Sequence, residues 1–180
     1  MRTAHRVRQV VNAVNLSTGF GLLLAATAAR GSRGVRRGPD GLLLAGGYRL
    51  PFPIAPVFTV GNVVLVRGDA ARLVDASEPG DGSGPGDESG PGDGSGPGDG
   101  SGPGEGSRLL RHEGRHATQY AWCLGLVMIP LYGACAGVSM LLCGDWASYN
   151  PFERLAGLTD GGYRRRPLRP FLRAPRRGED

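Results

Sequence analysis

The sequence predicts an α+β fold in which a small β-sheet is combined with several helices, some of them strongly apolar. Three observations carry this prediction: a β-branched run at residues 57–67, a charged helical pattern at 108–122, and 21 uncharged residues at 123–143. The length of 180 residues suits one small domain and is too short for two well-formed cores.

Residues 1–29 are predicted to form an N-terminal helix that is amphipathic at its start and apolar at its end. Valines recur at helical spacing between residues 7 and 14, and no charge occurs from residue 9 to residue 29. The strongly apolar part, residues 16–29, is too short to cross about 30 Å of hydrocarbon. We therefore expect an interfacial or weakly inserted helix. A signal peptide is the alternative, because basic residues precede an apolar region that ends in small residues.

Residues 30–163 are predicted to form the main domain, and its sheet comes first. After a basic connector at residues 30–37, short apolar runs at 42–45 and 48–50 are typical of strands. The best strand is VFTVGNVVLVR at residues 57–67, which is rich in β-branched residues and apolar on both faces. We expect these segments to belong to one small sheet.

A low-complexity insert interrupts this domain at residues 77–107. It repeats with a period of six residues, as in GDGSGP, and its repeats contain no apolar side chain. Nothing in it can offset the entropy lost on ordering, so we expect a disordered Gly/Pro/Ser/Asp loop. Calcium binding is the alternative because Asp and Gly recur, but the calcium-binding nonapeptide repeat needs an apolar residue in each turn.

The C-terminal part is predicted to contain an apolar segment followed by another helix and a basic tail. Residues 123–143 are long enough to cross a bilayer as a transmembrane helix, or to form a re-entrant hairpin broken at Pro130. A buried helix pair of a globular protein is the remaining alternative. Asn150 and Pro151 are expected to be the N-cap and first residue of the next helix. The Arg-rich tail at residues 164–180 is expected to be a disordered arm.

The helical segment at residues 108–122 contains the motif HExxH. His112 and His116 lie four residues apart, so on a helix both imidazoles point to the same side and can bind one Zn²⁺. Glu113 is the candidate catalytic base, acting on a water whose pKa the ion lowers. The alternative is a pair of surface His on a charged helix. All three cysteines lie in the apolar segment without CxxC spacing, which argues against a disulfide framework or a Cys-based zinc site.

With this motif the sequence resembles the zincin metallopeptidases. It is also similar to small bacterial membrane proteins in which HExxHxxQ leads into an apolar stretch and then into a helix that carries a Glu. The similarity covers roughly residues 41–163 without the insert. It implies a minimal zincin-like domain, in which a strand bordering the substrate cleft lies near the HExxH helix. Gln119 and Trp122 stand where a metzincin would have Gly and His, so that subgroup is excluded.

The resemblance to the gluzincin pattern implies a third metal ligand, a Glu on a later helix. Glu153 in NPFERLAGL fits that pattern, and Asp145 and Asp160 are weaker alternatives. A Glu in the first turn is also favoured by the helix dipole without any metal. If residues 123–143 span the membrane as one helix, His116 and Glu153 end on opposite sides and cannot share a metal. Arg residues flank every apolar segment, which favours a hairpin or an even number of crossings.

These observations lead to one hypothesis for function: a membrane-associated zinc-dependent hydrolase of peptide-like substrates in the bacterial cell membrane. Membrane lipids are the expected partner of the Arg-rich tail, since each Arg near an anionic surface adds about 1 kcal/mol. Nucleic acid is not an expected partner, because no recognised motif or aromatic interleaving accompanies the Arg residues. The alternative hypothesis is a non-catalytic integral membrane protein with an interaction role and a degenerate HExxH motif.

Overall fold

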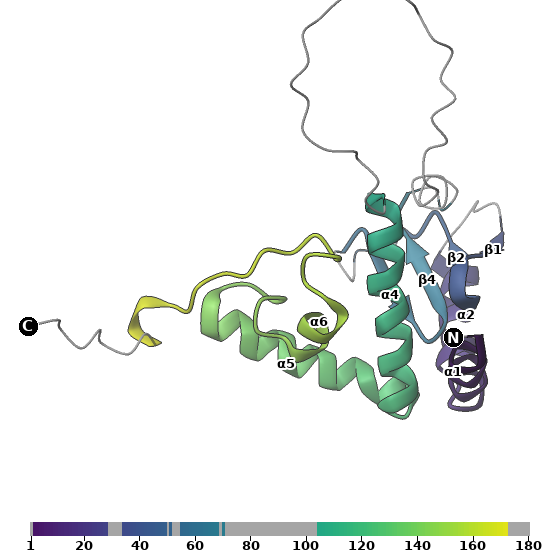
Figure 1. Cartoon of the computed structure of the whole chain (residues 1–180), viewed down its shortest axis with the longest axis horizontal. Helices are drawn as coiled ribbons and strands as arrows, with labels where there is room; N and C mark the ends of the chain where they lie inside the picture. The colour runs from purple at the N-terminus through teal and green to yellow at the C-terminus, as the bar shows by residue number, and fades with distance from the viewer. Residues whose placement is uncertain are drawn as a thin grey trace, which may run out of the picture.

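A mixed four-stranded sheet lies beside the central helix of the computed structural model (Figure 1). The strand order is β1-β2-β4-β3, and the strands are β1 (Val35–Arg37), β2 (Leu43–Ala45), β3 (Val57–Val60) and β4 (Val63–Val66). The pairing of β2 with β4 is parallel, and the other two pairings are antiparallel. The structure describes residues 2–28, 34–49, 51, 55–68, 70 and 104–172, so most of the expected insert lies outside the described residues. The predicted α+β class is confirmed.

The run at residues 57–67 forms a β-hairpin, β3 and β4, and not the single strand expected from its composition. The chain reverses at Gly61 and Asn62, and Gly61 has a positive φ of 62°. A Cβ atom at Gly61 would lie 2.5 Å from backbone atoms of Ser17 and Thr18, so only glycine fits there. Valines flank this turn on both sides, and for that reason composition alone does not reveal it.

Two further expectations for the sheet are wrong. The end of the expected connector at residues 30–37 forms the edge strand β1, which pairs with β2 after the tight turn at Pro39–Gly41. Tyr48 is not part of a strand, although its N–H donates to the carbonyl of Val66 at 3.0 Å. Leu50, at the end of the same expected strand, lies outside the described residues. Both errors concern backbone pairing with β2 or β4, which side-chain composition does not encode.

The N-terminal segment forms two helices, α1 (Arg2–Val14) and α2 (Ser17–Ala28), where the sequence predicted one. The two helices are bent by 73° at the break between them. Leu16 has a positive φ of 64° there, and the Asn15 side chain accepts a hydrogen bond from the Ser17 N–H at the start of α2. Because α2 packs on β3 and β4, it is part of the folded domain.

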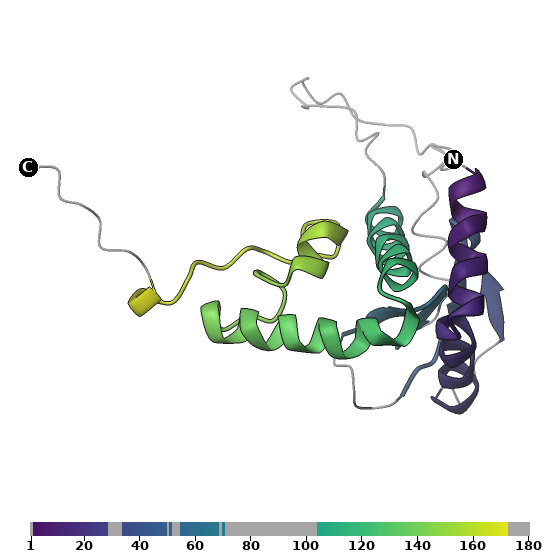
Figure 2. The same cartoon turned by 90° about the horizontal axis from the view of Figure 1, so that it is seen from below.

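Helix α4 (Glu105–Trp122) carries the HExxH motif, and α1 lies beside it (Figure 2). The helix predicted at residues 108–122 is confirmed, but it begins at Glu105, so the end of the expected disordered insert is helical. The face of α1 that meets α4 is polar: Arg8 donates to the carbonyl of Gly114 at 3.2 Å, and Asn12 donates to that of Ala117 at 2.8 Å. The valine stripe of α1 faces away and is largely exposed.

The apolar segment forms one continuous helix, α5 (Met128–Cys143), after the short 3₁₀ turn η2 (Gly125–Val127). Pro130 lies in the first turn of α5, where a missing N–H costs no helical hydrogen bond. The expected re-entrant hairpin at this residue is therefore not formed. The stretch Gly125–Cys143 is long and apolar enough to cross a membrane by length and composition, and 11% of it is buried.

After α5 the chain turns back along the helix. Gly144 ends α5 with a φ of 74°, and α6 (Pro151–Ala156) then packs against both α4 and α5 (Figure 2). The predicted start of α6 is confirmed: Pro151 is its first residue, and the Asn150 side chain accepts the Phe152 N–H at 3.1 Å. This reversal returns α6 to the helix that carries the HExxH motif.

Part of the Arg-rich tail is ordered against α5, which corrects the expectation of a disordered arm from residue 164 onward. The N–H of Arg169 donates to the carbonyl of Leu142 at 2.9 Å, and the N–H of Arg166 donates to Ser148 Oγ at 2.9 Å. A short 3₁₀ turn, η3 (Pro170–Leu172), follows. Residues 173–180 lie outside the described residues.

Candidate metal centre

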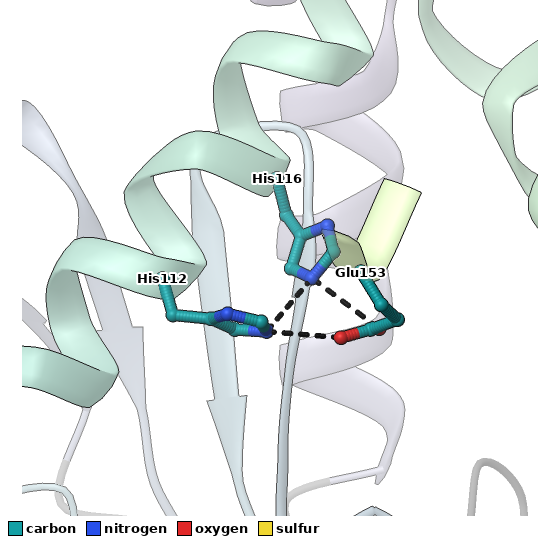
Figure 3. A group of neighbouring side chains, drawn as sticks. All are labelled: His112, His116 and Glu153. Atoms are coloured by element: carbon teal, nitrogen blue, oxygen red, sulfur yellow. Dashed lines mark hydrogen bonds and ion pairs between the residues drawn. The ribbon is translucent and has the colours of Figure 1, made fainter. Parts of the chain in front are cut away.

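Two helices bring three metal-ligating side chains together in the interior of the domain (Figure 3). His112 and His116 project from α4, and their Nε2 atoms lie 3.0 Å apart. Glu153 on α6 places Oε2 3.2 Å from His112 Nε2 and Oε1 3.5 Å from His116 Nε2. All three side chains are buried, and the group can hold a metal ion.

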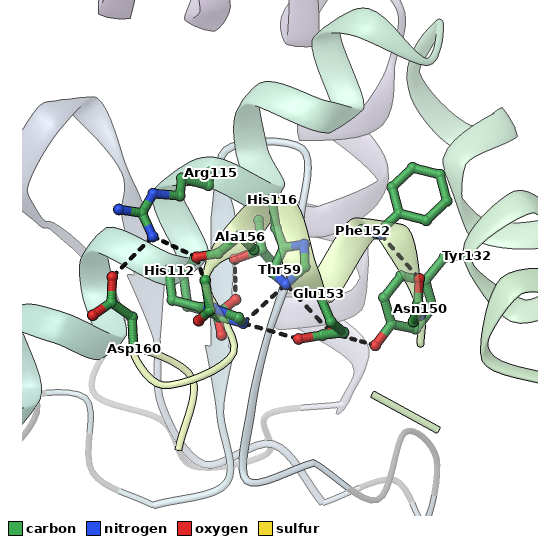
Figure 4. A network of polar contacts seen from close by, with 12 residues as sticks. Thr59, His112, Arg115, His116, Tyr132, Asn150, Phe152, Glu153, Ala156 and Asp160 are labelled. Atoms are coloured by element: carbon green, nitrogen blue, oxygen red, sulfur yellow. Dashed lines mark hydrogen bonds and ion pairs between the residues drawn. The ribbon is translucent and has the colours of Figure 1, made fainter. Parts of the chain in front are cut away.

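The hydrogen bonds of His112 fix which of its ring nitrogens carries a proton (Figure 4). Its Nδ1 lies 3.1 Å from the carbonyl oxygen of Ala156 and 3.0 Å from that of Gly157. Carbonyl oxygens only accept hydrogen bonds, so Nδ1 must be the donor. The neutral ring then presents an unprotonated Nε2 toward His116 and Glu153, which is the form that binds a metal.

His116 is oriented in the same way, through the side chain of Gln119. Gln119 donates from Nε2 to the carbonyl of Phe152 at 2.9 Å, so its Oε1 faces His116. That oxygen lies 2.8 Å from His116 Nδ1, which must therefore carry the proton. When His116 is neutral, its Nε2 is therefore unprotonated, as that of His112 is. The two Nε2 atoms then face each other at 3.0 Å, and a cation between them relieves the repulsion of their lone pairs.

The carboxylate of Glu153 has one buried oxygen that is available to bind a cation. Its Oε2 is buried and lies 3.2 Å from His112 Nε2, which carries no proton in the neutral tautomer described above. The oxygen therefore has no hydrogen-bond donor among the described residues, although a buried carboxylate oxygen normally has one. Glu153 Oε1 accepts a 2.5 Å hydrogen bond from the hydroxyl of Tyr132 on α5. The carboxylate is therefore held by one oxygen and presents the other to the two imidazoles.

The two charged partners of this cluster shift each other's pKa. Burial raises the pKa of Glu153, but contacts with His112, His116 and Tyr132 lower it by more, to about 2. Burial lowers the pKa of His116, but its hydrogen bond to Glu153 and the charges of Glu113 and Glu153 raise it by more. Without a metal, a proton on His116 thus takes the place of a cation beside the Glu153 carboxylate.

The spacing of the three ligand atoms suits a small tetrahedral ion. Ligand bonds of about 2.0–2.2 Å place neighbouring tetrahedral ligands about 3.4 Å apart, and the observed distances are 3.0, 3.2 and 3.5 Å. Gly161 lies directly against the cluster, because a Cβ there would come within 2.8 Å of His112 Nε2. Two His side chains and one carboxylate at this spacing can hold a metal ion, and Gly161 allows the chain to pack closely over them.

Glu113, the expected catalytic base, is buried on the side of α4 that meets the sheet. Its Oε2 accepts a 2.6 Å hydrogen bond from the hydroxyl of Thr59 on β3. Thr59 was not expected from the sequence, because it lies 54 positions from Glu113 and only the hairpin brings it to α4. The hydrogen bond from Thr59 fixes the orientation of the Glu113 carboxylate.

The two alternative carboxylates, Asp145 and Asp160, do not join the cluster. Asp145 accepts hydrogen bonds from Ser148, and Asp160 forms ion pairs with Arg111 and Arg115. Arg115 also donates to the carbonyl of Ala156 at 2.6 Å. It thereby ties the end of α6 to α4 and holds in place the carbonyl group that orients His112.

No match emerges from comparison with known proteins. No family model, no curated protein and no solved structure is significantly similar to the chain. The assignment of the site therefore rests on its own geometry.

The hydroxyl of Tyr132 is expected to tune metal affinity through Glu153. Removing a hydrogen bond to a carboxylate that holds a metal ion typically costs about 10–100-fold in metal affinity, so Tyr132→Phe is expected to weaken metal binding by that factor. The measurement is competition with a chromophoric chelator. Tyr149→Phe is the matched control, because the Tyr149 ring packs on Arg165 away from the cluster. Equal affinities of the two variants would contradict this role of Tyr132.

Proposed function

We propose that this chain is a membrane-associated, zinc-dependent hydrolase of the zincin type that cleaves peptide or amide bonds. The observation that carries the proposal is the convergence of three buried ligand atoms, the Nε2 atoms of His112 and His116 and a carboxylate oxygen of Glu153, all within 4.8 Å of one another. In this proposal His112, His116 and Glu153 hold Zn²⁺, and Glu113 is the catalytic base. Three protein ligands leave a fourth position of a tetrahedral ion free, as in catalytic zinc sites.

Zinc in such a site polarises a carbonyl group and lowers the pKa of a water molecule. The position of Glu113 indicates how the protein's own side chains would take part in the reaction. Thr59 holds Glu113 Oε2, which leaves Oε1 to accept the proton of the water that attacks the amide carbon. When the C–N bond breaks, Glu113 returns this proton to the leaving nitrogen. The products are one carboxyl group and one amine, with no net change at Glu113.

A peptide is the proposed substrate class because of the strand that contacts Glu113. β3 is an edge strand, hydrogen-bonded to β4 on one side only within the described sheet. An extended peptide can add to such an edge by backbone hydrogen bonds without a specific sequence. Since Thr59 of β3 contacts Glu113, a peptide bound along β3 would pass close to the base and the ligand cluster.

A non-catalytic role with a structural metal is the second candidate, and one observation favours it. His112, Glu113, His116 and Glu153 are all buried, as ligands of structural sites are. For hydrolysis, a substrate must therefore displace the segment that covers His112, which includes Gly161. The two candidates differ in the role of Glu113, which is needed for hydrolysis but not for a structural metal.

The proposal predicts that activity follows the metal. Full-length protein treated with a strong chelator is expected to lose cleavage of a mixed peptide library, measured by mass spectrometry. Stoichiometric Zn²⁺ is expected to restore it, whereas Mg²⁺ is not, because Mg²⁺ prefers oxygen ligands in octahedral geometry. Cleavage that is unchanged by the chelator would contradict a metal-dependent hydrolase.

A further inference from the structure

Helix α5 has one covered face and one open face. The returning chain covers the first: Ser139 Oγ donates to the carbonyl of Asp145 at 2.6 Å and accepts the N–H of Tyr149 at 2.8 Å. The second face is apolar, and its large side chains are between 41% and 72% exposed within the described residues: Ile129, Leu131, Val138, Met140 and Leu141. An open apolar face of this size on a basic protein indicates an interaction surface.

Charged side chains lie at the C-terminal end of the same helix. Arg164, Arg165, Arg166 and Arg169 are all exposed. Backbone hydrogen bonds from Arg169 to Leu142, and from Arg166 to Ser148, hold their segment next to α5 and to the returning chain. If α5 crossed a bilayer, the buried carboxylate of Glu153, which the hydroxyl of Tyr132 in the first half of α5 holds beside the helix, would lie at the depth of the hydrocarbon, where charged side chains are costly. At a membrane surface the guanidinium groups would meet phosphate headgroups.

The other end of α5 also presents apolar side chains. The Asn15 side chain at the α1–α2 break donates to the carbonyl of Tyr120, and Gly125 lies against the same Asn15. Around this junction Leu16, Trp122 and Leu124 are strongly exposed. Exposed Trp and Leu side chains are typical of the headgroup boundary of a membrane.

We propose that α5 lies in the plane of an anionic membrane surface, with its open apolar face in the lipid and both of its ends on the same side. The covered face, α6 and the metal cluster then remain above the bilayer. This arrangement lets Glu153 meet His116 while α5 is a single continuous helix. The inference rests on the membrane association in the proposed function, but not on zinc or on catalysis.

The first test measures binding of full-length protein to vesicles of phosphatidylcholine with and without phosphatidylglycerol. Val138→Glu places a charge on the open face. It is expected to weaken binding about tenfold, because the valine side chain that the lipid would bury is removed. Val35→Glu is the matched control, because Val35 lies on β1 and is 45% exposed, compared with 53% for Val138. Equal loss in both variants, or no binding by the wild type, would overturn the proposal.

The Arg residues are tested on the same vesicles. Arg164→Gln combined with Arg166→Gln is expected to weaken binding to anionic vesicles about 25-fold, because each Arg near the surface contributes about fivefold. Binding to neutral vesicles is expected to change hardly at all. A wild-type dimer that Val138→Glu dissociates, seen by analytical ultracentrifugation, would instead assign the open face to a second copy. Zinc content is measured for every variant, so a failure of docking is distinguished from a failure of the metal site.

The second test distinguishes lying in the plane from crossing. In a chain without its native cysteines, Trp122→Cys and Pro167→Cys place one thiol near each end of α5. Labelling with a membrane-impermeant maleimide is compared between right-side-out and inverted membrane vesicles. Both thiols are expected to react in one and the same of these two preparations. Labelling of the two thiols in opposite preparations would show that α5 crosses the bilayer and would overturn the proposal.

Discussion

Replacing Glu113 with Gln is expected to lower the rate of peptide hydrolysis by about 10²–10⁴-fold while zinc stays bound. Gln has the same shape and still accepts the hydrogen bond from Thr59 with its amide oxygen, but it cannot take a proton from water. The ligand atoms of His112, His116 and Glu153 are untouched by this change. The measurement is single-turnover cleavage together with zinc content.

Glu105→Gln is a matched control for this variant, because it makes the same chemical change at the start of the same helix. It is expected to keep both activity and zinc. If Glu113→Gln retained full activity, Glu113 would not be the base. If it lost zinc as well, the loss of activity would not distinguish a base from a ligand, and the assignment of Glu113 as a base alone would be wrong.

Replacing Glu153 with Gln is expected to have the largest effect on the metal. One ligand of three is exchanged for a neutral amide, so zinc affinity is expected to fall by more than the roughly 100-fold that loss of a supporting hydrogen bond can cause. The change also leaves His112 and His116 without the buried carboxylate beside them. Removing one partner of a buried ion pair typically costs about 3–5 kcal/mol of stability.

The measurements are zinc affinity by chelator competition and the free energy of unfolding in urea. Asp145→Asn is the control for ligand identity, since Asp145 was an alternative carboxylate and accepts hydrogen bonds from Ser148 away from the cluster. It is expected to keep wild-type affinity. If Asp145→Asn lost the metal and Glu153→Gln kept it, the third ligand would be misassigned.

The local parts of the site could be predicted from the sequence. The four-residue spacing of His112 and His116 brings both rings to one side of a helix whatever the rest of the fold does. Asn150 followed by Pro151 marks the start of α6, and it places Glu153 in the first turn. These features depend on a few neighbouring residues, so the structure and the sequence agree on them.

The contacts between distant segments could not be predicted. The hydrogen bond from Thr59 to Glu113 requires a hairpin that is set by Gly61, and that turn is hidden in a run of valines. The hydrogen bond from Tyr132 to Glu153 requires the chain to turn back after α5. No periodicity in one segment indicates which partner a second segment will meet.

The same limitation explains the error about the apolar segment. If residues 123–143 spanned the membrane as one helix, His116 and Glu153 would lie on opposite sides, so a re-entrant hairpin broken at Pro130 was expected instead. The helix is continuous, and the reversal lies after Gly144 instead. Composition locates the apolar helix, but only the packing of the returning chain on it shows where α6 lies.

The zinc content of purified full-length protein, determined by elemental analysis, tests the central claim most directly. We expect one zinc per chain in the wild type, and a large loss of zinc in His112→Ala, whose ring nitrogen is one of the three ligand atoms. The protein should be produced with zinc, iron, manganese and nickel all present, so that the identity of the metal is tested as well. A wild type without stoichiometric metal, or a His112→Ala variant that retains it fully, would contradict the account.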